Sequence, residues 1–206
     1  MQLDRRKRDV MLAITRKVRF FSFDQVDRAW YEDAREARRT LKMLCDAGLI
    51  QKFTVSAHPE IPTTDAVVTW SPGAPPPDFG AVSYVLQTRW QEPVGPVSVF
   101  TATAKAARYF AGYGGRLKRP LQATHDLHVA SIYLEFLKHR PIDAKAWISE
   151  DGLGPIKRRE KRPDALLQYG DGRPPVVIEF GGSYRRERVL KVHAHCAARG
   201  LSYELW

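Results

Sequence analysis

The sequence predicts an α+β (α/β) fold of two domains: a winged helix-turn-helix, then an α/β domain with the element order αβββαβ. Three helix-like patterns and two short apolar runs fill residues 1–72. A Pro-rich linker opens a bridging segment over residues 73–120. Strand-like runs between helical patterns fill residues 121–206, and 44% hydrophobic residues suffice for the cores of two small domains.

The first domain is expected to begin with three helices. Residues 4–17 and residues 33–47 carry apolar residues at intervals of three and four, which is the spacing of one helix face. Between them, Ser22 and Gln25 have the spacing of a capping box that opens a short second helix. Gly48 follows the third pattern and is expected to end that helix.

A β-hairpin is expected after the third helix, from residues 51–56 and 66–70, which flank a turn-rich segment. Three helices and a hairpin make a winged helix-turn-helix, whose third helix would enter the major groove of DNA. The candidate DNA-binding residues of that helix lie on the face opposite its apolar stripe: Arg35, Arg38, Arg39 and Lys42. Two alternatives stay open, a merely solvated face whose cations pair with nearby acids, and a protein-binding surface.

The charge of the chain favours a polyanionic partner. The formal net charge is +10, with 33 Lys and Arg against 23 Asp and Glu, and such a charge attracts nucleic acid or an acidic membrane surface. No apolar stretch has the length of a transmembrane helix or the form of a signal peptide, so a cytoplasmic protein is expected. The two cysteines, Cys45 and Cys196, lie far apart and indicate neither a zinc site nor a disulfide framework.

Two acids mark the second domain. Asp164 stands at the start of one strand-like run, and Glu179 ends the next, beyond a Gly/Pro turn. Two such strands would bring both carboxylates to one sheet edge, an arrangement suited to Mg²⁺. A basic run precedes this motif, and its candidate DNA-binding residues, which are equally explained as a solvated loop, are Lys157, Arg158, Arg159 and Lys161.

The pattern Pro163-Asp164, followed later by Glu179-Phe180-Gly181, resembles the PD-(D/E)xK nuclease superfamily. The resemblance implies an αβββαβ core in which Asp164 and Glu179 hold one Mg²⁺ ion and Glu150 or Glu135 adds a carboxylate; the alternative is that both acids pair with neighbouring arginines on a binding surface. Gly181 stands where that superfamily has a lysine, and Lys191 is a candidate to supply the missing charge, as are three nearby arginines: Arg185, Arg186 and Arg188. These catalytic and metal-binding roles apply only if the domain is an active nuclease; otherwise no cofactor is expected.

The whole chain resembles the replication-relaxation family of plasmid and mobile-element proteins. The residues that carry this resemblance are His125, Trp147 with Glu150, Pro163-Asp164 and Glu179. It implies a DNA-binding regulator or accessory factor of plasmid replication or mobilisation, with a degenerate nuclease-like domain. The alternative is a Mg²⁺-dependent DNA endonuclease using Asp164 and Glu179. Double-stranded DNA is the expected partner in both cases, a homodimer stays open, and a protein-interaction adaptor without DNA is a third class.

Overall fold

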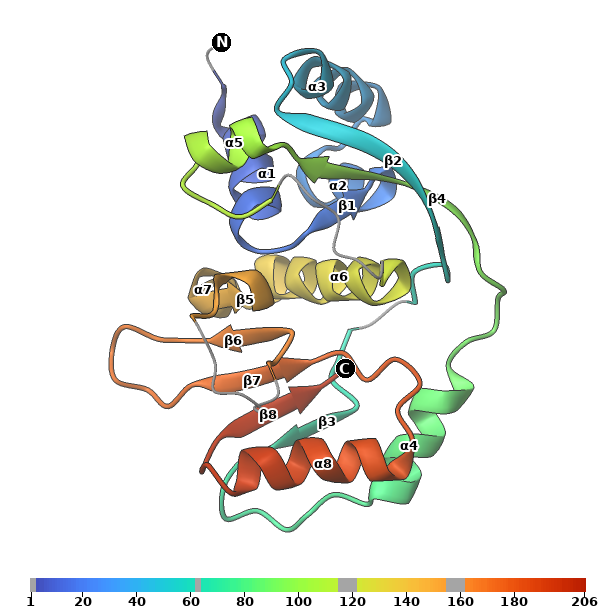
Figure 1. The fold of residues 1–206 in the computed structure, drawn as a ribbon, viewed down its shortest axis with the longest axis vertical. Helices are drawn as coiled ribbons and strands as arrows, with labels where there is room; N and C mark the ends of the chain where they lie inside the picture. Colours follow the sequence, from blue (N-terminus) through green and yellow to red (C-terminus); the bar gives the residue numbers. More distant parts are fainter. Residues whose placement is uncertain (1–2, 62–63, 115–121, 155–161) are drawn as a thin grey trace. The chain divides into compact units, whose positions relative to one another are not determined.

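The computed structural model describes residues 3–61, 64–114, 122–154 and 162–206, and it confirms a mixed α+β fold with two sheets (Figure 1). The chain divides into two compact units. Unit 1 comprises Met1–Glu60 and Val94–Leu134, and unit 2 comprises Ile61–Pro93 and Glu135–Trp206. Both units are therefore built from two separate stretches of sequence, unlike the contiguous domains expected over residues 1–72 and 121–206.

Unit 1 consists of helices around a three-stranded sheet. Its elements are α1 (Arg5–Arg16), β1 (Phe20–Ser22), α2 (Phe23–Trp30), α3 (Ala34–Asp46), β2 (Ile50–Ala57), β4 (Gly95–Ala102), α5 (Ala104–Tyr109) and the first part of α6 (Ala123–His139).

Local capping explains where the helices of unit 1 begin and end. The Ser22 hydroxyl accepts from the backbone N–H of Gln25 at 3.1 Å, and Oε1 of Gln25 accepts from the N–H of Ser22 at 2.9 Å. This reciprocal pair is the expected capping box of α2. Asp33 caps α3 through the N–H of Arg35, and Gly48 follows α3 with φ +66°, a value that favours glycine.

The sheet of unit 1 has the order β1-β4-β2 and is antiparallel throughout. Strand β2 pairs with β4 along its full length, from Ile50 opposite Ala102 to Ala57 opposite Gly95. The predicted hairpin between residues 51–56 and 66–70 is therefore wrong. Alternation of apolar residues indicated two strands correctly but did not indicate their partners, because many pairings bury the same faces.

Unit 2 contains a five-stranded sheet of order β3-β8-β7-β6-β5 (Figure 1). The pairs β3–β8, β5–β6 and β6–β7 are antiparallel, and β7–β8 is parallel. The elements of the unit are β3 (Val68–Trp70), α4 (Phe79–Thr88), the end of α6, α7 (Pro141–Ala146), β5 (Trp147–Ser149), the 3₁₀ turn η1 (Glu150–Gly152), β6 (Ala165–Leu167), β7 (Val176–Glu179), α8 (Arg186–Ala197) and β8 (Ser202–Leu205).

In the core of unit 2, β3 and α4, which lie between β2 and β4 in the sequence, pack with the C-terminal strand β8. Trp70 of β3 stacks on Tyr203 of β8 with ring centroids 5.7 Å apart, and both rings are buried. Leu86 of α4 and Val189 of α8 belong to the same buried cluster. Burial of these large apolar side chains explains why residues 68–70 pair with β8 rather than with β2.

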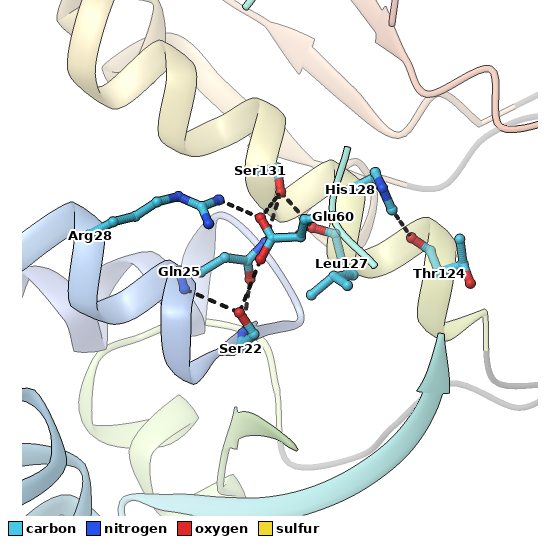
Figure 2. A network of polar contacts seen from close by, with 8 residues as sticks. All are labelled: Ser22, Gln25, Arg28, Glu60, Thr124, Leu127, His128 and Ser131. Atoms are coloured by element: carbon cyan, nitrogen blue, oxygen red, sulfur yellow. Dashed lines mark hydrogen bonds and ion pairs between the residues drawn. The ribbon is translucent and has the colours of Figure 1, made fainter. Parts of the chain in front are cut away.

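A polar network inside unit 1 surrounds Glu60, which lies where the chain leaves this unit (Figure 2). The Glu60 carboxylate accepts from the Ser22 hydroxyl at 3.1 Å, from the Ser131 hydroxyl at 2.6 Å, and from the Arg28 guanidinium. The Gln25 amide, fully buried, donates to the Ser131 oxygen at 2.9 Å. These bonds tie α2 to the first part of α6 and to the segment that follows β2.

Candidate functional site

The third helix of unit 1 has one buried face and one basic face. Ala37, Leu41 and Leu44 are buried within the unit, together with Thr40. The four cations expected to contact DNA are all exposed: Arg35, Arg38, Arg39 and Lys42. The structure therefore brings these side chains together on the solvent side of α3.

The carboxylates near α3 form their hydrogen bonds and ion pairs with groups other than the arginines of this helix. The Asp33 carboxylate accepts from a backbone N–H at the start of α3, and Glu36 accepts from Arg6 of α1 at 3.4 Å. Asp46 pairs with Lys42 at 2.6 Å. This hydrogen bond raises the pKa of Lys42 above its ordinary value. One of the four cations is thus partly neutralised.

The three arginines of α3 have no carboxylate partner within the described part of the chain. Arg38 lies over the ring of Phe23, at 5.1 Å from the ring centroid, so its planar guanidinium rests on an aromatic face. Arg35 and Arg39 are exposed. The expectation that nearby acids neutralise this face therefore holds for Lys42 alone.

In unit 2, the two acids of the motif face one another across a strand pair. Ala165 of β6 lies opposite Ile178 of β7, which puts Asp164 opposite Glu179 at the same end of both strands. Oδ2 of Asp164 accepts from the backbone N–H of Phe180 at 2.8 Å. Both residues therefore lie at the same end of neighbouring strands, as the sequence led us to expect.

Glu150 lies at the neighbouring strand. Its backbone N–H donates to the carbonyl oxygen of Asp164 at 2.9 Å, at the end of β5. Within residues 3–61, 64–114, 122–154 and 162–206, no group of three or more His, Cys, Asp or Glu side chains is arranged to hold a metal ion. The proposed set of Asp164, Glu179 and Glu150 therefore supplies carboxylates at adjoining strands without forming such a group.

Tyr184 joins the acid pair and was not expected from the sequence. Its hydroxyl donates to Oε2 of Glu179 at 3.4 Å. Burial raises the pKa of the Tyr184 phenol, and the nearby carboxylates of Glu179 and Asp164 raise it further. The phenol is therefore a neutral hydrogen-bond donor. A tyrosine five residues after Glu179 was the only available signal, and strand patterns alone do not reveal it.

Position 181, where the PD-(D/E)xK superfamily has a lysine, has no free space for a side chain in this structure. A Cβ atom on Gly181 would lie 2.7 and 2.8 Å from the two terminal methyl carbons of Leu86. Leu86 is fully buried on α4. Lys191 is exposed on α8, and the described contacts include none between it and Asp164 or Glu179.

The remaining candidate cations lie outside the described residues. They are Lys157, Arg158, Arg159 and Lys161. Arg162, which is described, donates from Nη1 to the carbonyl oxygen of Glu150 at 3.0 Å and so lies beside the acid-bearing strands.

None of the protein-family models, characterised proteins or solved structures compared with the chain matches it. The resemblances to the PD-(D/E)xK superfamily and to the replication-relaxation family therefore remain predictions. Among the described helices, none has the length and apolar character needed to cross a membrane.

Proposed function

We propose that the protein binds double-stranded DNA through the exposed face of α3. The observation that carries this proposal is the set of three arginines on α3 whose guanidinium groups have no carboxylate partner in the described residues: Arg35, Arg38 and Arg39. Unit 1 follows the order helix, strand, helix, helix, strand, strand with an antiparallel sheet, which supports its interpretation as a winged helix. In that fold the third helix enters the major groove.

Arginine is suited to this role because its planar group binds phosphate oxygens or the acceptor edge of guanine through two hydrogen bonds. Each phosphate contact releases counterions, so binding would weaken steeply with salt. The exposed residues of β2, among them Lys52, would form the wing beside α3.

The test is a duplex-binding titration of an Arg35→Gln, Arg38→Gln, Arg39→Gln triple variant at several salt concentrations. Removing up to three phosphate contacts should lower the slope of log affinity against log salt by about 2–3. The matched control is Arg108→Gln, Arg173→Gln, Arg199→Gln, which removes the same charge from exposed sites off α3. An equal loss in both variants would contradict a specific role for α3.

For unit 2 we propose a degenerate nuclease-like core that serves a regulator or accessory factor of a plasmid or mobile element. The supporting topology is the end of α6, three antiparallel strands, the helix α8 and a strand parallel to β7. Degeneracy is supported by Gly181, where Leu86 occupies the space that a longer side chain would need. The proposed mobile-element context rests on the resemblance between a few spaced residues of this chain, described above, and the replication-relaxation family.

A Mg²⁺-dependent endonuclease is the second candidate, because Asp164 and Glu179 lie opposite each other at one end of β6 and β7. Carboxylates so placed suit Mg²⁺, which binds one or two carboxylates together with substrate phosphates. Incubation with supercoiled DNA and Mg²⁺ or Mn²⁺ tests this candidate. Nicking that is lost in Asp164→Asn and in chelator would favour it, and a salt-sensitive gel shift without nicking would favour the regulator.

A further inference from the structure

Arg89 presents a buried positive charge without a hydrogen-bond partner. It caps the C-terminal end of α4, and its two terminal nitrogens are inaccessible to solvent and make no hydrogen bond to any described group. Burial lowers the pKa of Arg89 only to about 10, so the guanidinium stays charged at neutral pH. Holding an unpaired charge out of water costs free energy, and proteins seldom do so without a counter-charge.

An aromatic ring packs against this guanidinium. Its central carbon lies 5.2 Å from the ring centroid of Phe180, and the ring of Trp90 packs edge-on against Phe180 at 6.2 Å. Nε1 of Trp90 donates to the hydroxyl of Ser183 at 2.6 Å. The Phe180 ring and the carbonyl end of α4 offset part of the positive charge of Arg89. Neither accepts a hydrogen bond from its two terminal nitrogens.

Helix α4 contacts two successive residues at the end of β7: Leu86 packs against Gly181, and the guanidinium of Arg89 lies over the ring of Phe180. Leu86 and Arg89 are three residues apart on α4 and so lie on one face of the helix. Leu86 fills the space above Gly181, while Arg89 lies over Phe180, whose N–H binds Asp164. The guanidinium therefore lies over the ring of the residue that directly follows Glu179 in the sequence.

We propose that Arg89 is the cation of a binding site for a phosphate oxyanion at the end of β7. The two terminal nitrogens of a guanidinium match two oxygens of one phosphate, which would satisfy the donors that have no partner in the described residues. Arg89 and Trp90 are half-buried, and phosphate binding would require a change in the Arg89 rotamer that turns the fork toward solvent. The site itself is independent of α3; only the identification of the phosphate as a DNA diester rests on the proposed function.

The test compares thermal unfolding of the wild type and Arg89→Met in phosphate-free buffer and in rising inorganic phosphate at constant ionic strength. Phosphate should raise the Tm of the wild type, because a ligand that binds only the folded state stabilises it. Arg89→Met should lose this rise, with phosphate affinity weakened by about tenfold or more. Without phosphate, Arg89→Met should unfold at or above the wild-type temperature, since the unpaired charge is gone.

Three outcomes would overturn the proposal. A retained phosphate response in Arg89→Met, or no response in the wild type, would mean that Arg89 holds no phosphate. A lower Tm of Arg89→Met in phosphate-free buffer would make the guanidinium a structural cation on Phe180. Arg186→Met, which removes an exposed arginine at the start of α8, is the control and should respond as the wild type does. Arg89→Lys keeps the charge without the fork and should bind phosphate with intermediate affinity.

A second arm uses a short single-stranded oligonucleotide as the phosphodiester probe. Weaker oligonucleotide binding by Arg89→Met would identify the ligand as a nucleic-acid backbone, and a response to inorganic phosphate alone would identify a free phosphate. The triple variant of α3 should keep the Arg89-dependent response. Loss of duplex binding by α3 and loss of phosphate binding by Arg89 are thus measured separately, so either proposal can fail while the other stands.

Discussion

The side chain of Leu86 occupies the space into which a side chain on Gly181 would extend, with its Cδ2 atom 2.7 Å from the position of an added Cβ. Leu86 comes from the segment inserted between β2 and β4, and Gly181 follows β7. The absence of a side chain at position 181 is therefore a packing requirement of unit 2. A lysine at position 181 would have to displace a fully buried leucine.

Gly181→Ala is accordingly expected to destabilise the protein, although it adds only a methyl group. Overpacking of this kind costs about 1–3 kcal/mol. Leu86→Ala alone should cost about 2–5 kcal/mol through the cavity it leaves. In the double variant the added methyl group occupies the cavity left by Leu86. The loss of stability should therefore be smaller than the sum of the two single losses, by about 0.5–3 kcal/mol. Urea unfolding of the four proteins measures this coupling.

Gly170→Ala is the matched control for that cycle. No atom lies within 4 Å of a Cβ added at Gly170, so this change should have little effect on the free energy of unfolding. If Gly181→Ala cost the same in the presence and absence of the Leu86 side chain, the packing relationship would be wrong.

The discontinuous units give a second prediction, about fragments. A fragment of residues 1–72 lacks β4, the central strand between β1 and β2, and with it the buried side chains of Val99 and Phe100. We expect this fragment to be unfolded by circular dichroism. A chain that joins Glu60 to Val94 through a short Gly-rich linker and ends at Leu134 should fold, because Ala57 and Gly95 are already neighbours. A folded fragment 1–72 would contradict the assigned pairing of β2.

The first three helices could be predicted from the sequence, because the signals that define them are local, whereas β1 (Phe20–Ser22) and α7 (Pro141–Ala146) were not expected. Asp4, Ser22 and Asp33 cap the helices that were expected to follow them, and Gly48 ends α3 as expected. Strand pairing could not be predicted in the same way. Val68–Trp70 has the alternation of a strand in any sheet, and only burial against Tyr203 selects β8 as its neighbour.

The same limit applies to the candidate site. Asp164 and Glu179 could be placed at the same end of two strands because strands that follow one another across a Gly/Pro-rich turn were expected to pair as neighbours, so that the start of one lies beside the end of the other. Leu86 and Arg89 could not be connected with that edge, since their helix belongs to a distant stretch of sequence. Nor does the charge count of the chain distinguish a buried guanidinium from the exposed ones on α3.

The buried imidazole of His193 predicts a loss of stability in acid. The ring lies 4.8 Å from Trp70 and near the Tyr203 hydroxyl, with Nδ1 at 3.3 Å from that oxygen, and burial lowers the pKa of His193 below its ordinary value of 6.5. Between the lowered and the ordinary pKa, the unfolded chain binds more protons than the folded chain. The free energy of unfolding should therefore be unaffected by this group above about pH 6.5 and fall as the pH drops below it.

His193→Phe should reduce this acid sensitivity, because phenylalanine keeps the ring contacts without a titrating group. Chemical unfolding between about pH 7 and pH 5 measures the change in slope. Val189→Ala weakens the same buried cluster without removing a titrating group, so its loss of stability should be equal at each pH. An unchanged pH slope in His193→Phe would assign the acid sensitivity to other groups.

The partners of α3 predict unequal roles for its cations in DNA binding. Lys42 is paired with Asp46, whereas Arg39 is exposed and has no carboxylate partner in the described residues. Arg39→Gln should therefore weaken duplex binding more than Lys42→Gln, by up to roughly 1–3 kcal/mol if the arginine contacts a base. Asp46→Asn should strengthen binding, since it frees the Lys42 ammonium and removes a negative charge near the phosphates. Fluorescence anisotropy with one labelled duplex at constant salt compares the three variants. If Asp46→Asn left affinity unchanged while Arg39→Gln and Lys42→Gln lost it equally, the ion pair would have no influence on this surface, and the attraction would reflect net charge alone.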